Sequence, residues 1–424
     1  MTRMTLPPVE PPDLWPEIEQ RLSDPRPVHR VAGRLAAAVV ALLVFVSSGL
    51  LLWRAFTPER NDAVGLASGA LDAIPGGWTR LPDPPEVRLG ASYVWTGTEL
   101  LAWGGCDPSV REECAATADG YALDPTVGRW SRLAAAPAEG AHSAAIWTGS
   151  EALFLALDGP VRGVALDPER RAWRSIAEGP LDGRTGAIPV WTGSRVFVWG
   201  GGEASLSSSD GAMYDPGSDE WTVVAPSPIS LNSASGVWTG DEVIVFGSLL
   251  GQGNRARTET AVGAAYDPEA DAWRTLPASR LSPQATSAVW VGGRMVAWDY
   301  EPRSQEYDPG NDRWGPPIEM PFEFDECYPD SLALGDLVFA FYCGRAALYD
   351  TVGGTWEEID GGIVEEEIWS DAYERFLKVW RFADLVPAGP VAFLAAEGIT
   401  LNPKGVACYG CPGSPTSLWA FRPG

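Results

Sequence analysis

The sequence predicts an all-β fold, a seven-bladed β-propeller preceded by a single N-terminal transmembrane α-helix. Two observations lead to this prediction: an unbroken apolar run near the N-terminus, and an aspartate–tryptophan motif that recurs along most of the remaining chain. The 424 residues include 47 glycines, 37 prolines and 20 tryptophans, a composition typical of many short strands joined by turns.

The apolar run extends from Leu35 to Trp53, nineteen residues without a charged side chain. At about 1.5 Å per residue, a helix of this length crosses a hydrocarbon layer of about 30 Å. The alternatives are a buried core helix, which flanking Arg34 and Arg54 disfavour, and a cleaved signal peptide, which needs a small-residue cleavage site. No clear site of that kind precedes Arg54, so we expect an uncleaved membrane helix at residues 31–54.

Charge around this run predicts its orientation. Four arginines precede it and only two follow closely: Arg21, Arg26, Arg30 and Arg34 before, Arg54 and Arg60 after. Positive residues favour the cytoplasmic side. We therefore expect residues 1–30 in the cytoplasm, a linker at 55–69 and an extracytoplasmic propeller at 70–424, making a single-pass protein of the cell membrane.

The repeat is an aspartate followed six residues later by a tryptophan, as in YDPGSDEW at 214–221. Successive copies are 41 to 52 residues apart, the length of a four-stranded propeller blade. The pairs are Asp72 and Trp78, Asp124 and Trp130, Asp167 and Trp173, Asp215 and Trp221, Asp267 and Trp273, Asp308 and Trp314, and Asp350 and Trp356. We expect the aspartate to accept hydrogen bonds in a turn and both residues to be structural.

A second motif, Val or Ile followed by Trp-Thr-Gly, precedes most copies and reads as a tight turn between two apolar strands. Together the motifs resemble the kelch repeat of the galactose oxidase and kelch-type propeller superfamily, in which a Gly-Gly pair follows the second strand. Gly104 with Gly105 and Gly200 with Gly201 keep this pair, whereas blades two, four, five and six depart from it. The resemblance covers about residues 70–424 and implies the fold rather than a function.

Six blades are plain in the sequence, and the seventh is divided between the two ends of the repeat region. Residues 383–398 align with 187–202, and the final Phe421–Gly424 (FRPG) takes the place of YDPG. The missing fourth strand is then supplied by Trp78–Leu81. We expect this pairing to close the ring and remove its open edge.

The six cysteines suggest disulfides, because the propeller is expected outside the membrane. Their spacing favours Cys106 with Cys114, Cys327 with Cys343, and Cys408 with Cys411. The last pair also fits a redox motif, although no helix-forming pattern follows it.

Candidate ligand-binding residues lie in connections of variable length. Arg255 and Arg257 offer a basic pair for a carboxylate or an anionic glycan. Glu365, Glu366 and Glu367, with Asp371, form an acidic cluster that is read either as a Ca²⁺ or acid–base site or as a solvated loop or short helix. Otherwise the sequence predicts no cofactor and no metal site.

Charge and histidine content restrict the function. The formal net charge of −25 argues against nucleic acid as a partner. Only His29 and His142 are present, and His29 precedes the membrane run, which argues against copper oxidation of the galactose oxidase type. His142 is expected to be structural, the alternative being a Ser-His-Asp triad.

We therefore expect a binding or scaffolding module that recognises an extracytoplasmic protein or glycan through variable propeller loops. The alternatives are a carbohydrate-active enzyme on the same scaffold and a transmembrane sensor signalling to its cytoplasmic segment.

Overall fold

The computed structural model describes residues 69–424, apart from short internal segments. Those segments are 73, 87, 107–114, 158, 203–207, 232, 249–259, 284–286, 300–301, 322–329, 343–344, 360–365, 371–374, 380–381, 398, 402–406 and 410–415. For the strands within 366–384 and 396–416, the structure describes the backbone alone. No helix of the described residues is long and apolar enough to cross a bilayer. The predicted membrane helix at 31–54 lies outside them.

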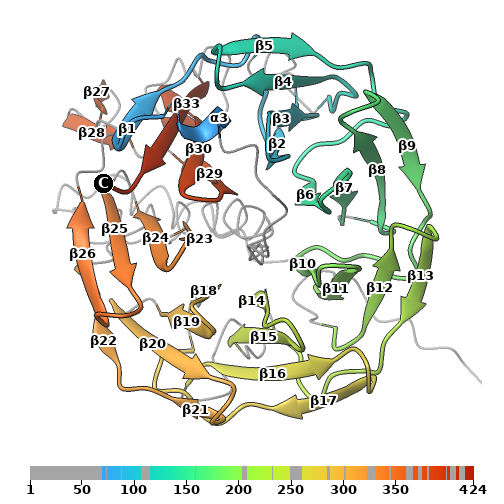
Figure 1. Cartoon of the computed structure of the whole chain (residues 1–424), viewed down its shortest axis with the longest axis vertical. Coiled ribbons are helices and arrows are strands. Elements are labelled where there is room, and N and C mark those ends of the chain that lie inside the picture. The colour runs from blue at the N-terminus through green and yellow to red at the C-terminus, as the bar shows by residue number, and fades with distance from the viewer. Residues whose placement is uncertain are drawn as a thin grey trace, which may run out of the picture. The chain divides into compact units, whose positions relative to one another are not determined.

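The described chain forms a β-propeller of seven blades, each built on four antiparallel strands, which confirms the predicted seven-bladed all-β propeller (Figure 1). Blade 1 consists of β2 (Ser92–Trp95), β3 (Leu100–Trp103), β4 (Gly120–Asp124) and β5 (Arg129–Arg132). Blade 2 consists of β6 (Ala144–Trp147), β7 (Ala152–Ala156), β8 (Arg162–Asp167) and β9 (Ala172–Ile176). Blade 3 consists of β10 (Ala187–Trp191), β11 (Val196–Gly200), β12 (Gly211–Asp215) and β13 (Glu220–Val223). Blade 4 consists of β14 (Ser233–Trp238), β15 (Val243–Ser248), β16 (Val262–Asp267) and β17 (Ala272–Thr275). Blade 5 consists of β18 (Ser287–Val291), β19 (Arg294–Trp298), β20 (Arg303–Asp308) and β21 (Arg313–Trp314), and a short fifth strand, β22 (Ile318–Glu319), pairs with β20.

Blade 6 consists of β23 (Asp330–Leu334), β24 (Leu337–Tyr342), β25 (Arg345–Asp350) and β26 (Thr355–Ile359). Blade 7 combines β29 (Phe382–Ala388), β30 (Val391–Glu397) and β33 (Thr416–Arg422) with β1 (Gly77–Arg80) from the start of the described chain. β1 pairs with β33 so that Trp78 lies opposite Phe421. The predicted closure by an N-terminal fourth strand is therefore found, with FRPG in the place of YDPG.

The hydrophobic core consists of seven clusters, one at each junction between neighbouring blades. At the junction of blades 3 and 4, for example, fully buried Trp199 packs 5.7 Å from the ring of Trp273. Each cluster also receives the tryptophan of the repeat from one of its two blades: Trp78, Trp130, Trp173, Trp221, Trp273, Trp314 or Trp356. The repeat therefore supplies the contacts that hold the ring together.

The repeat aspartates act as expected in the turn between the third and fourth strands. The Asp215 carboxylate accepts from the Gly217 backbone N–H at 2.8 Å. Equivalent bonds to turn N–H groups form at Asp124, Asp167, Asp267, Asp308 and Asp350. The early copy differs, because Asp72 ends a short helix and its carboxylate lies 3.7 Å from the Arg422 guanidinium.

The tryptophan of the repeat reaches back to the preceding blade through its indole N–H. In blade 3, Trp221 Nε1 donates to the Ala177 carbonyl at 2.8 Å, while the Ala177 N–H donates to Asp219 at 3.0 Å. The same two bonds, at 2.7 and 2.8 Å, join Trp273 and Asp271 to Ala225 at the next junction. The backbone N–H and carbonyl of Ala177 are thus both hydrogen-bonded to the next blade, and the same holds for Ala225.

The Gly-Gly pair lets the backbone pass close to the chain that enters the inner strand. Gly201 has a φ of +69°, and a β-carbon there would lie 2.5 Å from the Ala187 nitrogen. Gly105 in blade 1 has a φ of +87° and would meet the Ala91 nitrogen at 2.9 Å. Only glycine fits both the left-handed conformation and this spacing.

Candidate functional site

The two faces of the ring differ in their connections. We call the face that carries the turns between first and second and between third and fourth strands the turn face, and the opposite face the loop face. Antiparallel pairing within each blade places the remaining connections on the loop face. Turn-face connections such as 96–99 are short, whereas the loop face carries the connections that vary in length and two further hairpins.

These hairpins are insertions next to and within blade 7. β27 (Glu366–Ser370) pairs with β28 (Arg375–Val379), and β31 (Ile399–Leu401) pairs with β32 (Ala407–Tyr409). Glu366 and Glu367 therefore lie on a strand, not on the loop or short helix considered from their acidic composition. Glu365, Arg255 and Arg257 lie outside the described residues, so these binding candidates stay predictions.

Cys106 lies where the loop-face connection of blade 1 begins. Its backbone forms an isolated bridge with Leu89 on one side and with Ala116 on the other, which extends blade 1 on the loop face. The side chains of Cys114, Cys327, Cys343, Cys408 and Cys411 lie outside those that the structure describes, so the three predicted pairings remain predictions.

His142 lies where the chain passes from blade 1 to blade 2. Its φ is +50°, and its backbone N–H donates to the Gly90 carbonyl at 2.7 Å. The His142 ring fills the space beside Gly90 that a side chain at position 90 would need, since a β-carbon on Gly90 would lie 2.3 Å from Cε1 of His142. These contacts give the residue a packing role.

A bidentate ion pair joins the entry of blade 3 to its own loop-face connection. Arg184, only 7 % exposed, donates through both terminal nitrogens to the two Asp210 oxygens at 2.7 Å each. Hydrogen bonds from Arg184, opposed by burial and assisted by Ser208, lower the pKa of Asp210 to about 2. This pair fixes the start of the inner strand β10 against the connection that leads into β12.

Acid is expected to weaken this link. Because the folded-state pKa of Asp210 lies below the usual value of 3.8, its contribution to stability is present above pH 3.8 and is lost as the pH falls towards 2. Asp210→Asn should cost about 1–3 kcal/mol at neutral pH, because it leaves the buried Arg184 without its carboxylate, and it should remove the part of the acid dependence that this pair contributes. Urea unfolding of the variant at pH 5 and pH 2.5 measures both effects. The exposed Asp182→Asn is the matched control, and an equal loss there would contradict the assignment.

A second loop-face network surrounds the start of blade 1. Arg88 pairs with Glu86 and lies 3.6 Å from Asp119, which also binds Arg132 at 2.9 Å. A hydrogen bond from Tyr121, followed by one from Arg88, lowers the pKa of Glu86. The charges here are mutually compensated, so the network fixes the chain beside Cys106.

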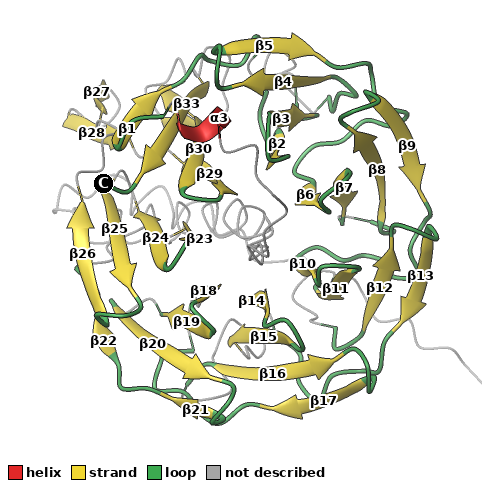
Figure 2. Ribbon diagram, viewed as in Figure 1, coloured by secondary structure: helices red, strands yellow, loops and turns green. Residues whose placement is uncertain are grey.

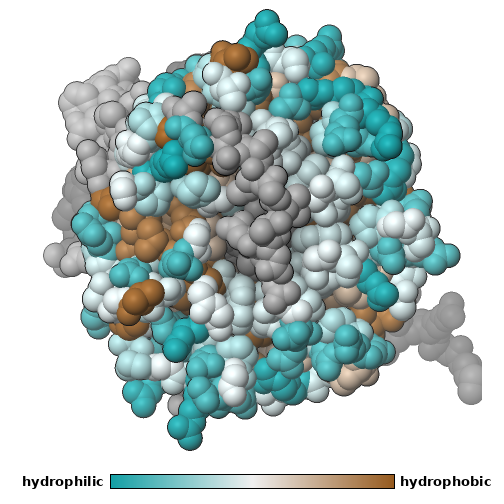
Figure 3. Space-filling model, viewed as in Figure 1, coloured by the Kyte–Doolittle hydropathy of each residue, from teal (hydrophilic) through white to brown (hydrophobic). Residues whose placement is uncertain are grey.

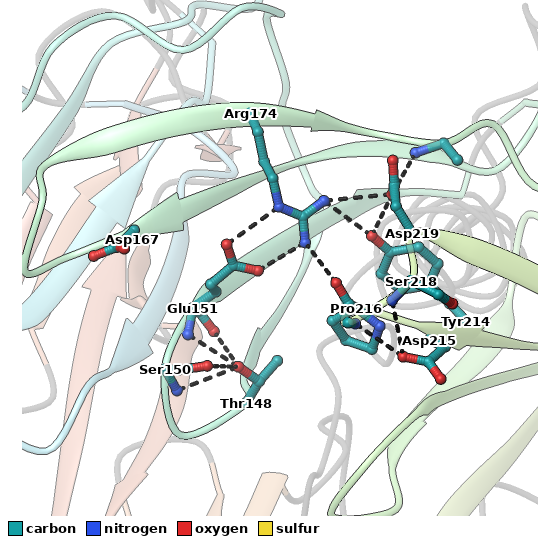
Figure 4. Close-up of polar contacts among 12 residues, drawn as sticks. Thr148, Ser150, Glu151, Asp167, Arg174, Tyr214, Asp215, Pro216, Ser218 and Asp219 are labelled. Carbon is teal, nitrogen blue, oxygen red and sulfur yellow. Dashed lines mark hydrogen bonds and ion pairs between the residues drawn. The ribbon is translucent and has the colours of Figure 1, made fainter.

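On the turn face, Arg174 is the centre of a network that spans blades 2 and 3 (Figure 4). It contacts both Glu151 oxygens at 3.2 and 2.7 Å, and the Tyr214 hydroxyl at 3.1 Å. Tyr214 in turn donates to Asp219 at 2.6 Å. Burial, and then the bond to Asp219, raises the pKa of Tyr214.

The same network recurs between blades 4 and 5, where Arg274 binds Glu242 at 2.6 and 2.9 Å and Tyr307 at 3.1 Å. Burial, and then the bond from Tyr307 to Asp312, raises the pKa of Tyr307 to about 12. The sequence carries a signal for both networks, since an arginine directly follows the repeat tryptophan in AWR at 172–174 and 272–274. All partners are satisfied, so these networks join blades rather than await a ligand.

The surface seen in Figure 3 is hydrophilic around most of its rim, and apolar atoms gather over β24 and β25. Partly buried Leu337, Leu348 and Ile359 pack against the core between blades 6 and 7. Within the described ranges, no three histidine, cysteine or acidic side chains are grouped as a metal site would require.

No protein-family model matches this chain, and a search of curated proteins finds no significant relative.

Proposed function

We propose that this chain is a kelch-type propeller, anchored in the cell membrane by residues 31–54 and held outside it, that binds an extracytoplasmic protein or glycan through its loop face. No chemistry is assigned to it. The proposal depends on one observation: the chain enters and leaves the ring on the turn face, whereas its variable connections lie on the loop face.

The position of the chain ends follows from strand direction. β33 runs from the loop face to the turn face and ends beside the start of β1, since Gly77 lies opposite Arg422. Helix α3 (Gly69–Asp72), the one helix among the described residues (Figure 2), precedes β1. Its Leu71 packs in the same cluster as Trp95 and Val391 at the turn-face ends of blades 1 and 7.

Arg422 holds this entry segment in place by donating to the carbonyls of Leu71 and Ile74 at 3.2 and 3.1 Å. A chain that arrives from the membrane thus joins the ring on the turn face. The connection to the predicted membrane helix would then lie on the turn face, which favours the loop face for contact with another molecule. Its connections are longer than strand pairing requires, and such excess is usually functional.

Binding is tested with the full-length chain purified in detergent, applied to a glycan array, and crosslinked on intact cells. The loop-face variant carries Arg255→Ala, Arg257→Ala and a shortened 248–262 connection. The matched control carries Arg129→Ala and Arg170→Ala, which remove the same charge from the turn face. We expect the loop-face variant to lose at least about tenfold in array signal and crosslinked partner.

The control should retain both signals. Loss in the control with retention in the loop-face variant, while both melt like the wild type, would place the binding surface on the turn face.

A further inference from the structure

Three buried polar groups lie at the junction of blades 5 and 6. They are the Ser287 hydroxyl, the Trp298 indole N–H and the Ser331 hydroxyl, on residues that are 4 %, 0 % and 0 % exposed. None of the three has a hydrogen-bond partner within the described part of the chain. Buried polar groups in native proteins are almost always paired, so this junction requires an explanation.

The register brings the three groups to the same place. Ser287 lies directly opposite Trp298 in the β18–β19 pair, so both side chains project from the same side of blade 5. Trp298 belongs to the core cluster shared with blade 6. Ser331 projects from the same side of β23 as Ala333, which packs against that cluster. All three residues lie at the loop-face ends of their strands.

Equivalent positions elsewhere show what is different at this junction. In blade 1, Ser92 lies opposite Trp103; its hydroxyl donates to the Ser143 carbonyl of blade 2 at 2.8 Å and accepts from the Ser143 N–H at 3.1 Å. The indoles of Trp103 and Trp199 donate to backbone carbonyls of their own loop-face connections at 3.2 and 3.1 Å.

Blade 5 has a much shorter connection between its second and third strands, from Trp298 to Arg303. Among the described residues of this connection, Asp299 and Pro302, no carbonyl accepts from the Trp298 indole, although Trp298 keeps the position of Trp103 and Trp199. Blade 5 thus keeps the buried serine and tryptophan but lacks the longer connection whose carbonyl accepts from the indole in blades 1 and 3.

We propose that a buried water molecule, held by Ser287, Trp298 and Ser331, is a permanent part of the junction between blades 5 and 6. The indole N–H can only donate, whereas each hydroxyl can donate and accept. One water that accepts from the indole and exchanges hydrogen bonds with both hydroxyls has three partners, the usual number for a buried water. The surrounding Val289, Val296 and Ala340 are apolar, which disfavours an ion.

A map of the full-length chain at about 2 Å resolution tests this directly, because a buried water with three partners is well ordered at that resolution. We expect density within hydrogen-bonding distance of all three groups. The double variant Ser287→Ala with Ser331→Ala supplies an independent test, in which the direction of the change in melting temperature decides. If water is bound, the double variant loses its hydrogen bonds and melts about 2 to 4 °C lower.

If the junction is dry, the same variant removes two unsatisfied hydroxyls and melts at the wild-type temperature or above. Either that result or a map without density among the three groups overturns the proposal.

Discussion

Deletion of residues 62–82 is expected to abolish the cooperative unfolding of the propeller. It removes β1, the fourth strand of blade 7, and leaves the β33 edge unpaired. It also removes Trp78, whose ring lies 4.9 Å from Phe421 and 6.1 Å from Phe339 of blade 6. Thermal unfolding of the full-length chain, followed by tryptophan fluorescence, should show a broad transition in place of a single sharp one.

Trp78→Ala gives a graded version of this test. Loss of the indole leaves a cavity in the junction of blades 6 and 7, and we expect a cost of about 2–4 kcal/mol. Val352→Ala, at a residue 89 % exposed in a turn of blade 6, is the matched control and should cost less than about 0.5 kcal/mol. Unchanged melting of the deletion variant would contradict closure by β1.

Trp199→Ala should be among the most destabilising single substitutions in the ring. The side chain is fully buried, packs on Trp273 of blade 4 and donates to the Ser209 carbonyl. Loss of this volume at a blade junction is expected to cost about 3–5 kcal/mol in urea unfolding. Trp199→Phe keeps most of the ring and should cost less, mainly the hydrogen bond.

The exposed Val223→Ala on the outer strand of the same blade serves as the control for this substitution. A Trp199→Ala protein that unfolds at the wild-type urea concentration would show that stability does not depend on the junction cores.

The repeat predicted the blades because each motif encodes a local structure that is independent of its neighbours. Asp215 and its equivalents bind turn N–H groups within three residues, so their spacing alone identifies the turn. The closing strand was predictable for the same reason: Trp78 stands without a preceding YDP, and FRPG stands without a following tryptophan. Each fragment requires the other.

Contacts between blades were harder to predict. The partners of Arg174 include Glu151 in its own blade and Tyr214 in the next, 23 and 40 residues away, and their meeting depends on how far one blade is rotated against another. The loop face was harder still, because its connections share no motif. The β27–β28 hairpin was not predicted, because the acidic run at 365–367 indicates a solvated loop or a short helix. The apolar residues that follow this run, and those of the partner strand Arg375–Val379, are the signal for the hairpin.

The most direct measurement of the closed ring is a disulfide across its last strand pair. Leu81 N–H donates to the Leu418 carbonyl opposite it, so the adjacent Arg80 and Trp419 form a non-hydrogen-bonded pair with Cα atoms about 4.5 Å apart. Arg80→Cys with Trp419→Cys should therefore oxidise to a disulfide between the two ends of the propeller, identified by peptide mapping without reduction. Arg80→Cys with Ser417→Cys, a diagonal pair about 7–8 Å apart, should not. A bridge in the first protein alone is the result expected of the closed ring, and no bridge, or equal bridging in both, would contradict it.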